Sequence, residues 1–143
     1  MAASPLARLR RLCLALPEAH EVSAWGEPTF RVRNKMFATF ASASNHHGDG
    51  RHAAWVKALP VNQDLLVGSA PQRVFVPPYV GPSGWIGLYL DGVADWDEVA
   101  RLLREGYTLV APKRLLAEAP PPLPQATAKT RRPRRPATKR PRR

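Results

Sequence analysis

The chain has 143 residues, a length typical of one domain, and its formal net charge of +11 is distributed very unevenly. No apolar run approaches the ~18 residues that cross a bilayer, and Arg8, Arg10 and Arg11 interrupt the apolar N-terminal stretch, so neither a membrane span nor a signal peptide is expected. The single cysteine, Cys13, is consistent with a reducing compartment, which predicts a cytoplasmic protein.

The charge divides the chain into two parts. Nine of the 22 lysines and arginines lie between residues 129 and 143, and no acid follows Glu118. The rest keeps 13 cations against 11 acids and is therefore close to neutral. Residues 118–143 also contain seven prolines and only one large apolar side chain, Leu123, which predicts disorder. The sequence thus predicts a folded domain over 1–117 and a basic tail over 118–143.

The basic tail predicts contact with DNA or RNA. A flexible polycation binds phosphates by releasing condensed counterions, which gives salt-sensitive affinity without base readout. The predicted contact residues are Lys129, Arg131, Arg132, Arg134, Arg135, Lys139, Arg140, Arg142 and Arg143. The alternative is that the tail only solubilises the domain. No membrane partner is expected, because no apolar anchor or lipidation motif accompanies the charge.

The first predicted element is a helix in "SPLARLRRLCLALP", residues 4–17, with Ser4 as N-cap and Pro5 at the first helical position. Next, the run "WGEPTFRVRNKMFATF", residues 25–40, predicts a turn at "GEP" and then a β-hairpin that turns at Asn34. Simple alternation would place phenylalanines on both faces of its second strand. The segment 41–52 is polar and contains glycine, so it predicts a loop.

Further strands are predicted at "AAWVKAL", at residues 74–76 and at "GWIGLYLDG", with a short helix around Leu65 and Leu66. The segment "DWDEVARLLREGYTLV" predicts a helix that Asp95 and Glu98 cap reciprocally, and "APKRLL" predicts a last helical turn. Helix, several strands and helix in this order indicate an α+β fold: an antiparallel β-sheet with helices packed on one face.

These segments together resemble the MmcQ/YjbR family of small bacterial proteins. The resemblance rests on "LPEAHE", "WGEPTFRVRNKMFA", "PPYVGPSGWIGLYLDG" and "DWDEVARLLREGYTLVAPK", and it covers about residues 5 to 114. It implies a compact α+β domain related in shape to the frataxin-like CyaY proteins. It also implies DNA binding through a proposed double-wing arrangement of hairpins, and it carries no catalytic residue set. The basic tail and the polar insert "ASNHHGDGRH" depart from the family pattern.

The hairpin offers a second candidate contact with nucleic acid. Arg31, Arg33 and Lys35 lie on and beside its turn, where a wing would present them to phosphates. The competing interpretation is an ordinary solvent-facing strand, favoured by the nearly neutral charge of the domain.

Two further candidates concern ligands and metals. An aromatic surface formed by Trp25, Phe37, Tyr79 and Trp85 is the alternative function: a protein- or small-molecule-binding module. The insert holds His46, His47, His52 and Asp49, but a glycine-containing loop does not preorganise metal ligands, so no metal and no cofactor is predicted. No catalytic motif stands out, and a non-enzymatic protein is expected.

Overall fold

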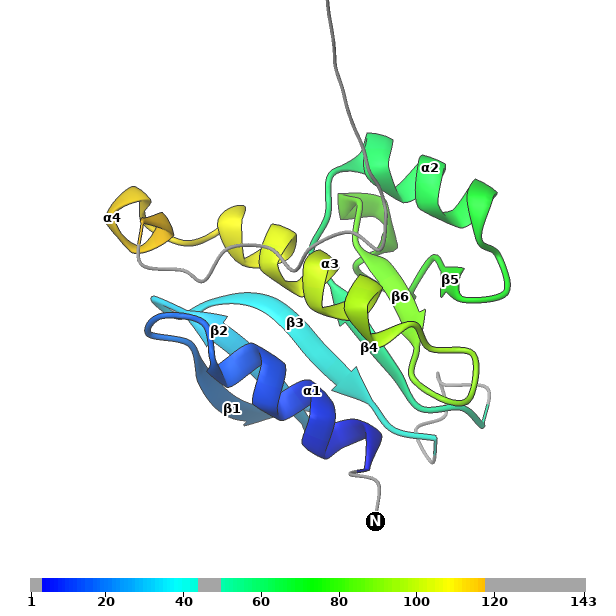
Figure 1. Ribbon diagram of the computed structural model, residues 1–143, viewed down its shortest axis with the longest axis horizontal. Helices are drawn as coiled ribbons and strands as arrows, with labels where there is room; N and C mark the ends of the chain where they lie inside the picture. The colour runs from blue at the N-terminus through cyan, green and yellow to red at the C-terminus, as the bar shows by residue number, and fades with distance from the viewer. Residues whose placement is uncertain (1–3, 44–49, 118–143) are drawn as a thin grey trace, which may run out of the picture.

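The computed structural model describes residues 4–43 and 50–117. The nine tail cations, together with His46, His47 and Asp49, lie outside the described residues. The predicted fold class is confirmed: a six-stranded antiparallel sheet, in the order β1-β2-β3-β4-β6-β5, carries helices on one face. Figure 1 shows α1 and α3 lying over that face, with α2 at the β5 end of the sheet. No helix within the two described ranges has the length and apolarity to span a bilayer.

The elements follow the predicted order, with one additional strand at His20–Ala24. The strands are β1 (His20–Ala24), β2 (Glu27–Val32), β3 (Lys35–Ala41), β4 (Ala53–Val56), β5 (Val74–Phe75) and β6 (Ile86–Tyr89). The helices are α1 (Pro5–Leu14), α2 (Pro60–Ser69), the 3-10 turn η1 (Gly81–Ser83), α3 (Trp96–Thr108) and α4 (Lys113–Leu116).

Helices α1 and α3 begin as the sequence predicts. The Ser4 hydroxyl accepts a hydrogen bond from the Ala7 amide at 3.1 Å, and Asp95 accepts from the Asp97 and Glu98 amides at 3.1 and 3.2 Å. The reciprocal half of the second cap is replaced by an ion pair, because the Glu98 carboxylate receives Arg73 at 3.1 Å. That ion pair ties the first turn of α3 to the residue before β5.

The first three strands are joined by two turns of the same kind. Ala24 pairs with Glu27 around Trp25 and Gly26, whose φ angles are 54° and 77°. Val32 pairs with Lys35 around Arg33 and Asn34, at 52° and 65°. Two central residues with positive φ define the type I′ turn, whose twist matches that of the flanking strands. The hairpin predicted around Asn34 is confirmed, while the first turn falls at Trp25–Gly26, just before "EP".

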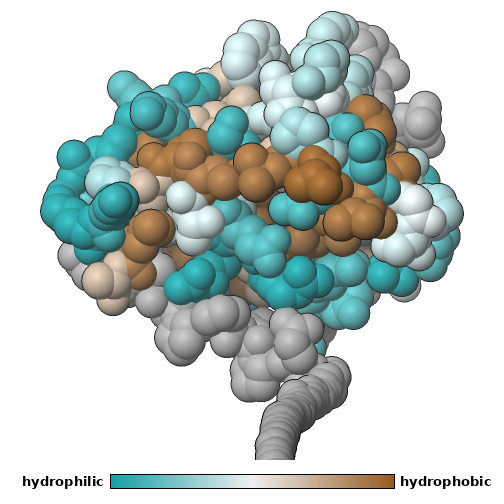
Figure 2. Space-filling view, turned by 90° about the horizontal axis from the view of Figure 1, so that it is seen from above, coloured by the Kyte–Doolittle hydropathy of each residue, from teal (hydrophilic) through white to brown (hydrophobic). Residues whose placement is uncertain are grey.

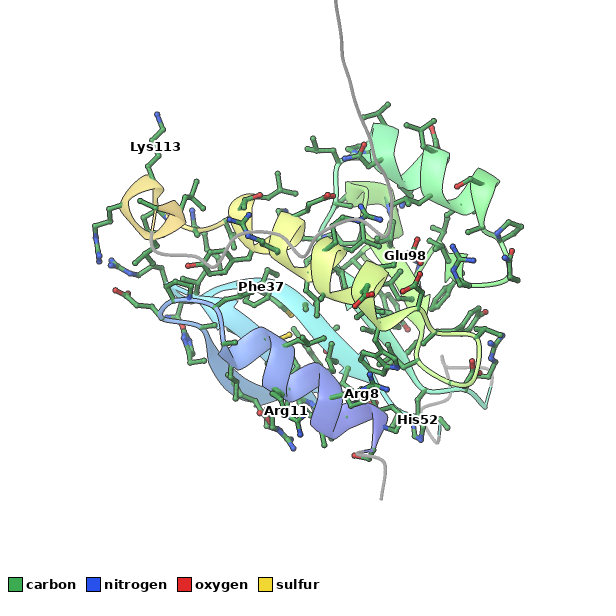
Figure 3. All side chains as sticks on the ribbon, viewed as in Figure 1. Arg8, Arg11, Phe37, His52, Glu98 and Lys113 are labelled. Atoms are coloured by element: carbon green, nitrogen blue, oxygen red, sulfur yellow. The ribbon has the colours of Figure 1, made fainter. Side chains whose placement is uncertain are left out.

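Phe37 does not point away from Ala38 and Phe40, as simple alternation predicted. Phe30 pairs with Ala38 and Arg31 with Met36, so Phe37 is the extra residue of a β-bulge and has no partner in β2. The bulge turns its side chain toward α3, where the ring meets Tyr107 edge to face at 5.7 Å (Figure 3). The expectation of phenylalanine on both faces of β3 is therefore wrong.

The hydrophobic core lies between this face of the sheet and the helices. Side chains of paired residues stand on the same face of a sheet, and the row Phe30, Ala38, Val56 and Ile86 is wholly buried. Helix α1 contributes Leu9 and Cys13 to this core, and α3 contributes the residues that lie on its inner face. Those residues of α3 are Val99, Leu102, Leu103 and Tyr107.

Candidate functional site

The three hairpin cations do not form one surface. Arg31 donates from Nε to the Thr29 hydroxyl at 3.1 Å, on the sheet face that carries no helix. Arg33 lies in the turn and pairs with Glu18 at 2.9 Å, on the side of α1. Lys35 is exposed at the start of β3. The structure thus brings these residues close in sequence but directs Arg31 and Arg33 to different neighbours.

Most other arginines of the described part are paired with carboxylates at the surface. The ion pairs besides that of Arg33 are Arg10–Glu21, Arg51–Asp91, Arg73–Glu98, Arg101–Glu105 and Arg114–Glu18. Hydrogen bonds from the Arg51 guanidinium hold the pKa of Asp91 below its ordinary value. Arginine charge on this surface is thus largely offset by nearby carboxylates.

The remaining labelled cations come from opposite ends of the molecule (Figure 3). Arg8 and Arg11 project from α1, whereas Lys113 projects from α4. Arg8 lies 4.3 Å over the ring of Trp96, and Lys57 lies 5.9 Å over the ring of Trp85. Within residues 4–43 and 50–117, these cations do not gather into one basic face.

The predicted aromatic surface is correct for two of its four members. Trp25 is 82% exposed and Tyr79 is 74% exposed. Phe37 is fully buried against α3 and Trp85 is 5% exposed, so the prediction is wrong for both. The bulge explains Phe37. Trp85 is buried because it directly follows Gly84, whose left-handed φ of 98° turns the chain toward β6.

Trp25 and Tyr79 line one groove on the face of the sheet that carries no helix. Its volume is about 530 Å³, within the range of small-molecule sites. Met36 and Trp55 form much of its apolar wall, and Glu27 contributes a carboxylate. The groove thus joins the first turn, the middle of the sheet and the segment before η1.

Strand register explains how these residues meet. Thr39 pairs with Trp55 and Trp55 with Gly87, so their side chains share the face opposite the core. Met36 joins them because the bulge at Phe37 restores it to that face. Farther along, the Phe75 ring occupies the space that a side chain at residue 87 would need. The outer face is therefore filled at β5 and hollow at β3 and β4.

The segment that carries Tyr79 is fastened to α2. The Gln63 side-chain amide donates to the carbonyl oxygens of Gly81 at 2.9 Å and Trp85 at 2.7 Å. A Cβ at Gly84 would lie 2.7 Å from the backbone nitrogen of Pro60, so only glycine allows this close approach. The "GPSGW" stretch therefore has a structural role: its contacts with α2 limit where the preceding residues, including Tyr79, can lie.

Both exposed aromatics occupy strained backbone. Tyr79 has a φ of 66°, and Trp25 has 54° at a turn position dominated by asparagine, aspartate and glycine. A left-handed conformation costs a residue with a β-carbon about 1–2 kcal/mol. Strain of this kind clusters at functional sites, and two of the five non-glycine residues with positive φ in the described ranges border the groove.

Two residues singled out by their chemistry have structural roles. His52 accepts a hydrogen bond from the Ala43 amide at 2.9 Å through Nδ1, and its ring stacks on Phe40 at 5.4 Å. Cys13 is fully buried, and burial raises the pKa of its thiol far above the ordinary value. A protonated, inaccessible thiol is a poor nucleophile, as expected for a core cysteine. In the described part of the chain, no three His, Cys, Asp or Glu side chains cluster as metal ligands.

A second apolar surface lies near α2 and the end of α3. Seen from above, a band of hydrophobic residues crosses the molecule (Figure 2). Exposed apolar side chains of these elements include Leu59, Val61 and Leu65 at α2 and Leu109 after α3. A hollow bordered by Leu59 and Leu109 is about 40 Å³, far smaller than the sheet-face groove.

The fold defines an α+β domain in which six antiparallel strands build one sheet beneath α1 and α3. A family model described as YjbR matches residues 14–109, and the chain belongs to the YjbR family. The crystal structure of Deinococcus radiodurans protein DR2400, with the family-model domain DUF419, is similar at a TM-score of 0.65 and 22% identity. The alignment covers 89% of this chain and 99% of that one, which shows a shared fold. No curated protein matches the chain.

Sequence reasoning missed most of the groove lining, including Glu27, Met36 and Trp55. Trp55 was assigned correctly to a strand, but which face it occupied depended on the register with β3 and β6. Met36 depended on the bulge. The sequence held one signal for the location of this groove, which is Trp25 in the Trp25–Gly26 turn. A large aromatic residue at a turn position suited to asparagine indicates a role outside folding.

Proposed function

We propose that this YjbR-family chain is a non-enzymatic, cytoplasmic protein that associates with DNA or RNA, mainly through its basic tail. The observation that carries the proposal is the division of charge. Nine cations lie in residues 129–143 with no acid among them. In the described domain, by contrast, six arginines pair with carboxylates.

The tail supplies affinity rather than sequence recognition. Phosphate contacts from an extended polycation release counterions but fix no side chain against a base edge. The hairpin makes at most a secondary contact through Arg31 and Lys35, because Arg33 is already paired with Glu18. The pKa shifts of the described domain support a non-enzymatic role, since surface ion pairs explain those of Arg10, Arg51, Arg73 and Asp91 and burial explains that of Cys13.

A salt titration of DNA binding tests this proposal. We compare the full chain with a variant in which all nine tail cations become glutamine, using fluorescence anisotropy of a labelled duplex and of a labelled RNA. With six to nine phosphates contacted, log K falls against log salt with a slope of about −5 to −8 for the native chain on the duplex. The variant keeps length and prolines, so it isolates charge.

The expected result is loss of most of the affinity and of the salt slope in the glutamine variant. An unchanged slope would show that the tail does not bind the nucleic acid. The matched hairpin variant Arg31→Gln/Lys35→Gln is expected to reduce the slope by no more than about 2, because each phosphate-binding cation that is removed changes the slope by about 1.

A second candidate function is a protein- or small-molecule-binding module, with the tail only solubilising. The groove favours it, because exposed Trp25 and Tyr79 border an apolar hollow of about 530 Å³. Quenching of tryptophan fluorescence by a ligand tests this candidate. Such quenching is expected to persist in the glutamine variant of the tail.

A further inference from the structure

Strand β1 forms one edge of the sheet and is paired on one side only. All five of its residues, His20–Ala24, match β2 without a bulge. In Figure 1 no described helix or strand lies beyond β1 at that margin. The opposite edge differs, because β5 has only two residues and α2 lies against it. A regular edge strand such as β1 presents a row of unpaired backbone groups to which a second strand can bind.

The outward backbone groups of β1 belong to Glu21 and Ser23. Opposite residues of an antiparallel ladder alternate between hydrogen-bonded and non-hydrogen-bonded pairs. Ser23 lies opposite Pro28, which has no N–H to exchange, so the hydrogen-bonded pair beside it is Val22 with Thr29. The Thr29 hydroxyl also donates to the Val22 carbonyl at 2.6 Å. The amides and carbonyls of Glu21 and Ser23 therefore point away from β2, where no described residue pairs with them.

The edge lacks the features that usually prevent strand pairing. Natural edge strands carry prolines, bulges or lysines, and β1 has none of these. Its one carboxylate, on Glu21, accepts hydrogen bonds from Arg10 Nε at 2.7 Å and Nη2 at 3.0 Å. Leu14, one turn after Arg10 on the same side of α1, is 42% exposed. This charge-balanced, partly apolar margin favours a partner strand without excess charge.

We propose that the β1 edge binds the β1 edge of a second copy of this chain, in a symmetric antiparallel pair. With Val22 on the two-fold axis, Glu21 lies opposite the partner's Ser23, and the two residues exchange backbone hydrogen bonds. An axis at Glu21 would place two glutamates face to face, which is unfavourable. An axis at Ser23 would run the pairing into the turn after β1. Only the Val22 axis pairs all five residues and keeps the carboxylates apart.

The two six-stranded sheets join into one continuous sheet in this dimer. Val22, and with it His20 and Ala24, shares the face of Thr29, which carries no helix. The partner's His20 therefore lies opposite Ala24, which lines the groove, and extends the groove wall. Dimerisation also places two basic tails on one particle, which increases avidity for a nucleic acid long enough to contact both.

Sedimentation equilibrium of the full chain tests the proposal. An edge contact is small, so we expect a weak dimer whose average mass rises from that of one chain toward that of two between about 5 and 500 μM. The mass of one chain at every concentration would overturn the proposal. The nine-glutamine tail variant should associate at least as strongly, because its tails no longer repel each other. Loss of association in that variant would contradict pairing through β1.

Ser23→Pro locates the contact. It removes an outward N–H and leaves the ladder with β2 intact, because proline is tolerated where the N–H faces away from the sheet. We expect the dimer to weaken about tenfold or more, while circular dichroism confirms the fold. Ser23→Thr is the matched control, because it keeps the N–H and suits a strand, so association should persist. An undiminished dimer in Ser23→Pro would overturn the proposal.

Val22→Cys tests the register, and it decides the matter even if the proline variant does not fold. Residues facing each other in a non-hydrogen-bonded pair have Cα atoms about 4.5 Å apart, within reach of a disulfide. We expect a covalent dimer after mild oxidation, measured by non-reducing electrophoresis. The buried native Cys13 does not compete. Ser23→Cys is the control, because its own counterpart lies diagonally, about 7–8 Å away. No cross-link from Val22→Cys, or a stronger one from Ser23→Cys, would overturn the proposal.

Discussion

The two faces of the sheet use aromatic residues in opposite ways. On the face under α1 and α3, Phe30 and Phe37 are wholly buried, and Phe37 meets Tyr107 edge to face. On the other face, Trp25 and Tyr79 border an open groove and are mostly exposed. Burial and packing of Phe30 and Phe37 stabilise the folded state, whereas the strained backbone and exposed rings of Trp25 and Tyr79 do not. The comparison indicates that the helix face holds the fold together and that the open face is available for binding.

The largest expected effect is on the helix face. Phe37→Ala removes a fully buried ring, and we expect it to lower the free energy of unfolding by about 3–5 kcal/mol. Urea denaturation followed by circular dichroism measures the change. The same truncation at exposed Leu65 should cost less than about 0.5 kcal/mol. Similar losses at the two positions would contradict the burial of Phe37.

The next effect tests whether the Phe75 ring covers Gly87 on the sheet face that carries no helix. Gly87→Ala places a Cβ inside the space of the Phe75 ring, and such overpacking costs about 1–3 kcal/mol. Gly68→Ala is the matched control, because it adds the same methyl group in α2 where no atom lies within 4 Å. The control should stabilise by about 0.5–1 kcal/mol through helix propensity. A neutral Gly87→Ala would show that Phe75 does not cover β6.

A smaller effect concerns the ion pair between Arg51 and Asp91. The pair is about one-third exposed, so Asp91→Asn should lower the free energy of unfolding at pH 7 by less than about 1 kcal/mol. The Arg51 hydrogen bonds lower the folded-state pKa of Asp91, so its contribution is complete above the unfolded value of about 3.9. The contribution disappears as the pH falls through the lower folded value.

The pH series provides its own control. Thermal melts of the native chain and of Asp91→Asn between pH 7 and pH 2 should converge at the acid end. A difference that stayed constant over this range would mean that the charge of Asp91 is not responsible for it.

The smallest effect on stability is expected for a substitution on the sheet face that carries no helix. Trp25→Asn exchanges a strained, 82% exposed residue for one that favours positive φ, so the melting temperature should stay the same or rise slightly. Differential scanning calorimetry measures it. A loss of more than about 1 kcal/mol would contradict the view that Trp25 has no stabilising role, since surface changes usually stay within about 0.5 kcal/mol.

The sequence was sufficient to predict elements with strong local signals. Ser4 and Asp95 marked the starts of α1 and α3, and Asn34 marked a hairpin turn, because capping and turn geometry depend on neighbouring residues. Strand β1 was missed because "HEVSA" lacks an alternating apolar pattern. Its burial alternates only between intermediate and exposed, and its position depends on pairing with β2.

The candidate site was harder to predict because it depends on register. A single bulge at Phe37 changed which face Met36 and Phe37 occupy, and periodicity alone contains no information on where a bulge falls. The aromatic surface predicted from the sequence includes Trp85 and not Trp55, but Gly84 directs Trp85 inward and pairing with Thr39 places Trp55 on the groove side of the sheet. Long-range pairing, not local preference, decided each of these outcomes.

The two hydrogen bonds from Gln63 have a consequence for recognition. Through one amide, the segment from Gly81 to Trp85, which follows Tyr79 closely, is fixed to a ten-residue helix. The chain therefore meets the entropic cost of ordering the Tyr79 wall when it folds, and a ligand arriving later has less to immobilise. Preorganisation of this kind favours a ligand of fixed shape over one that requires the wall to adapt.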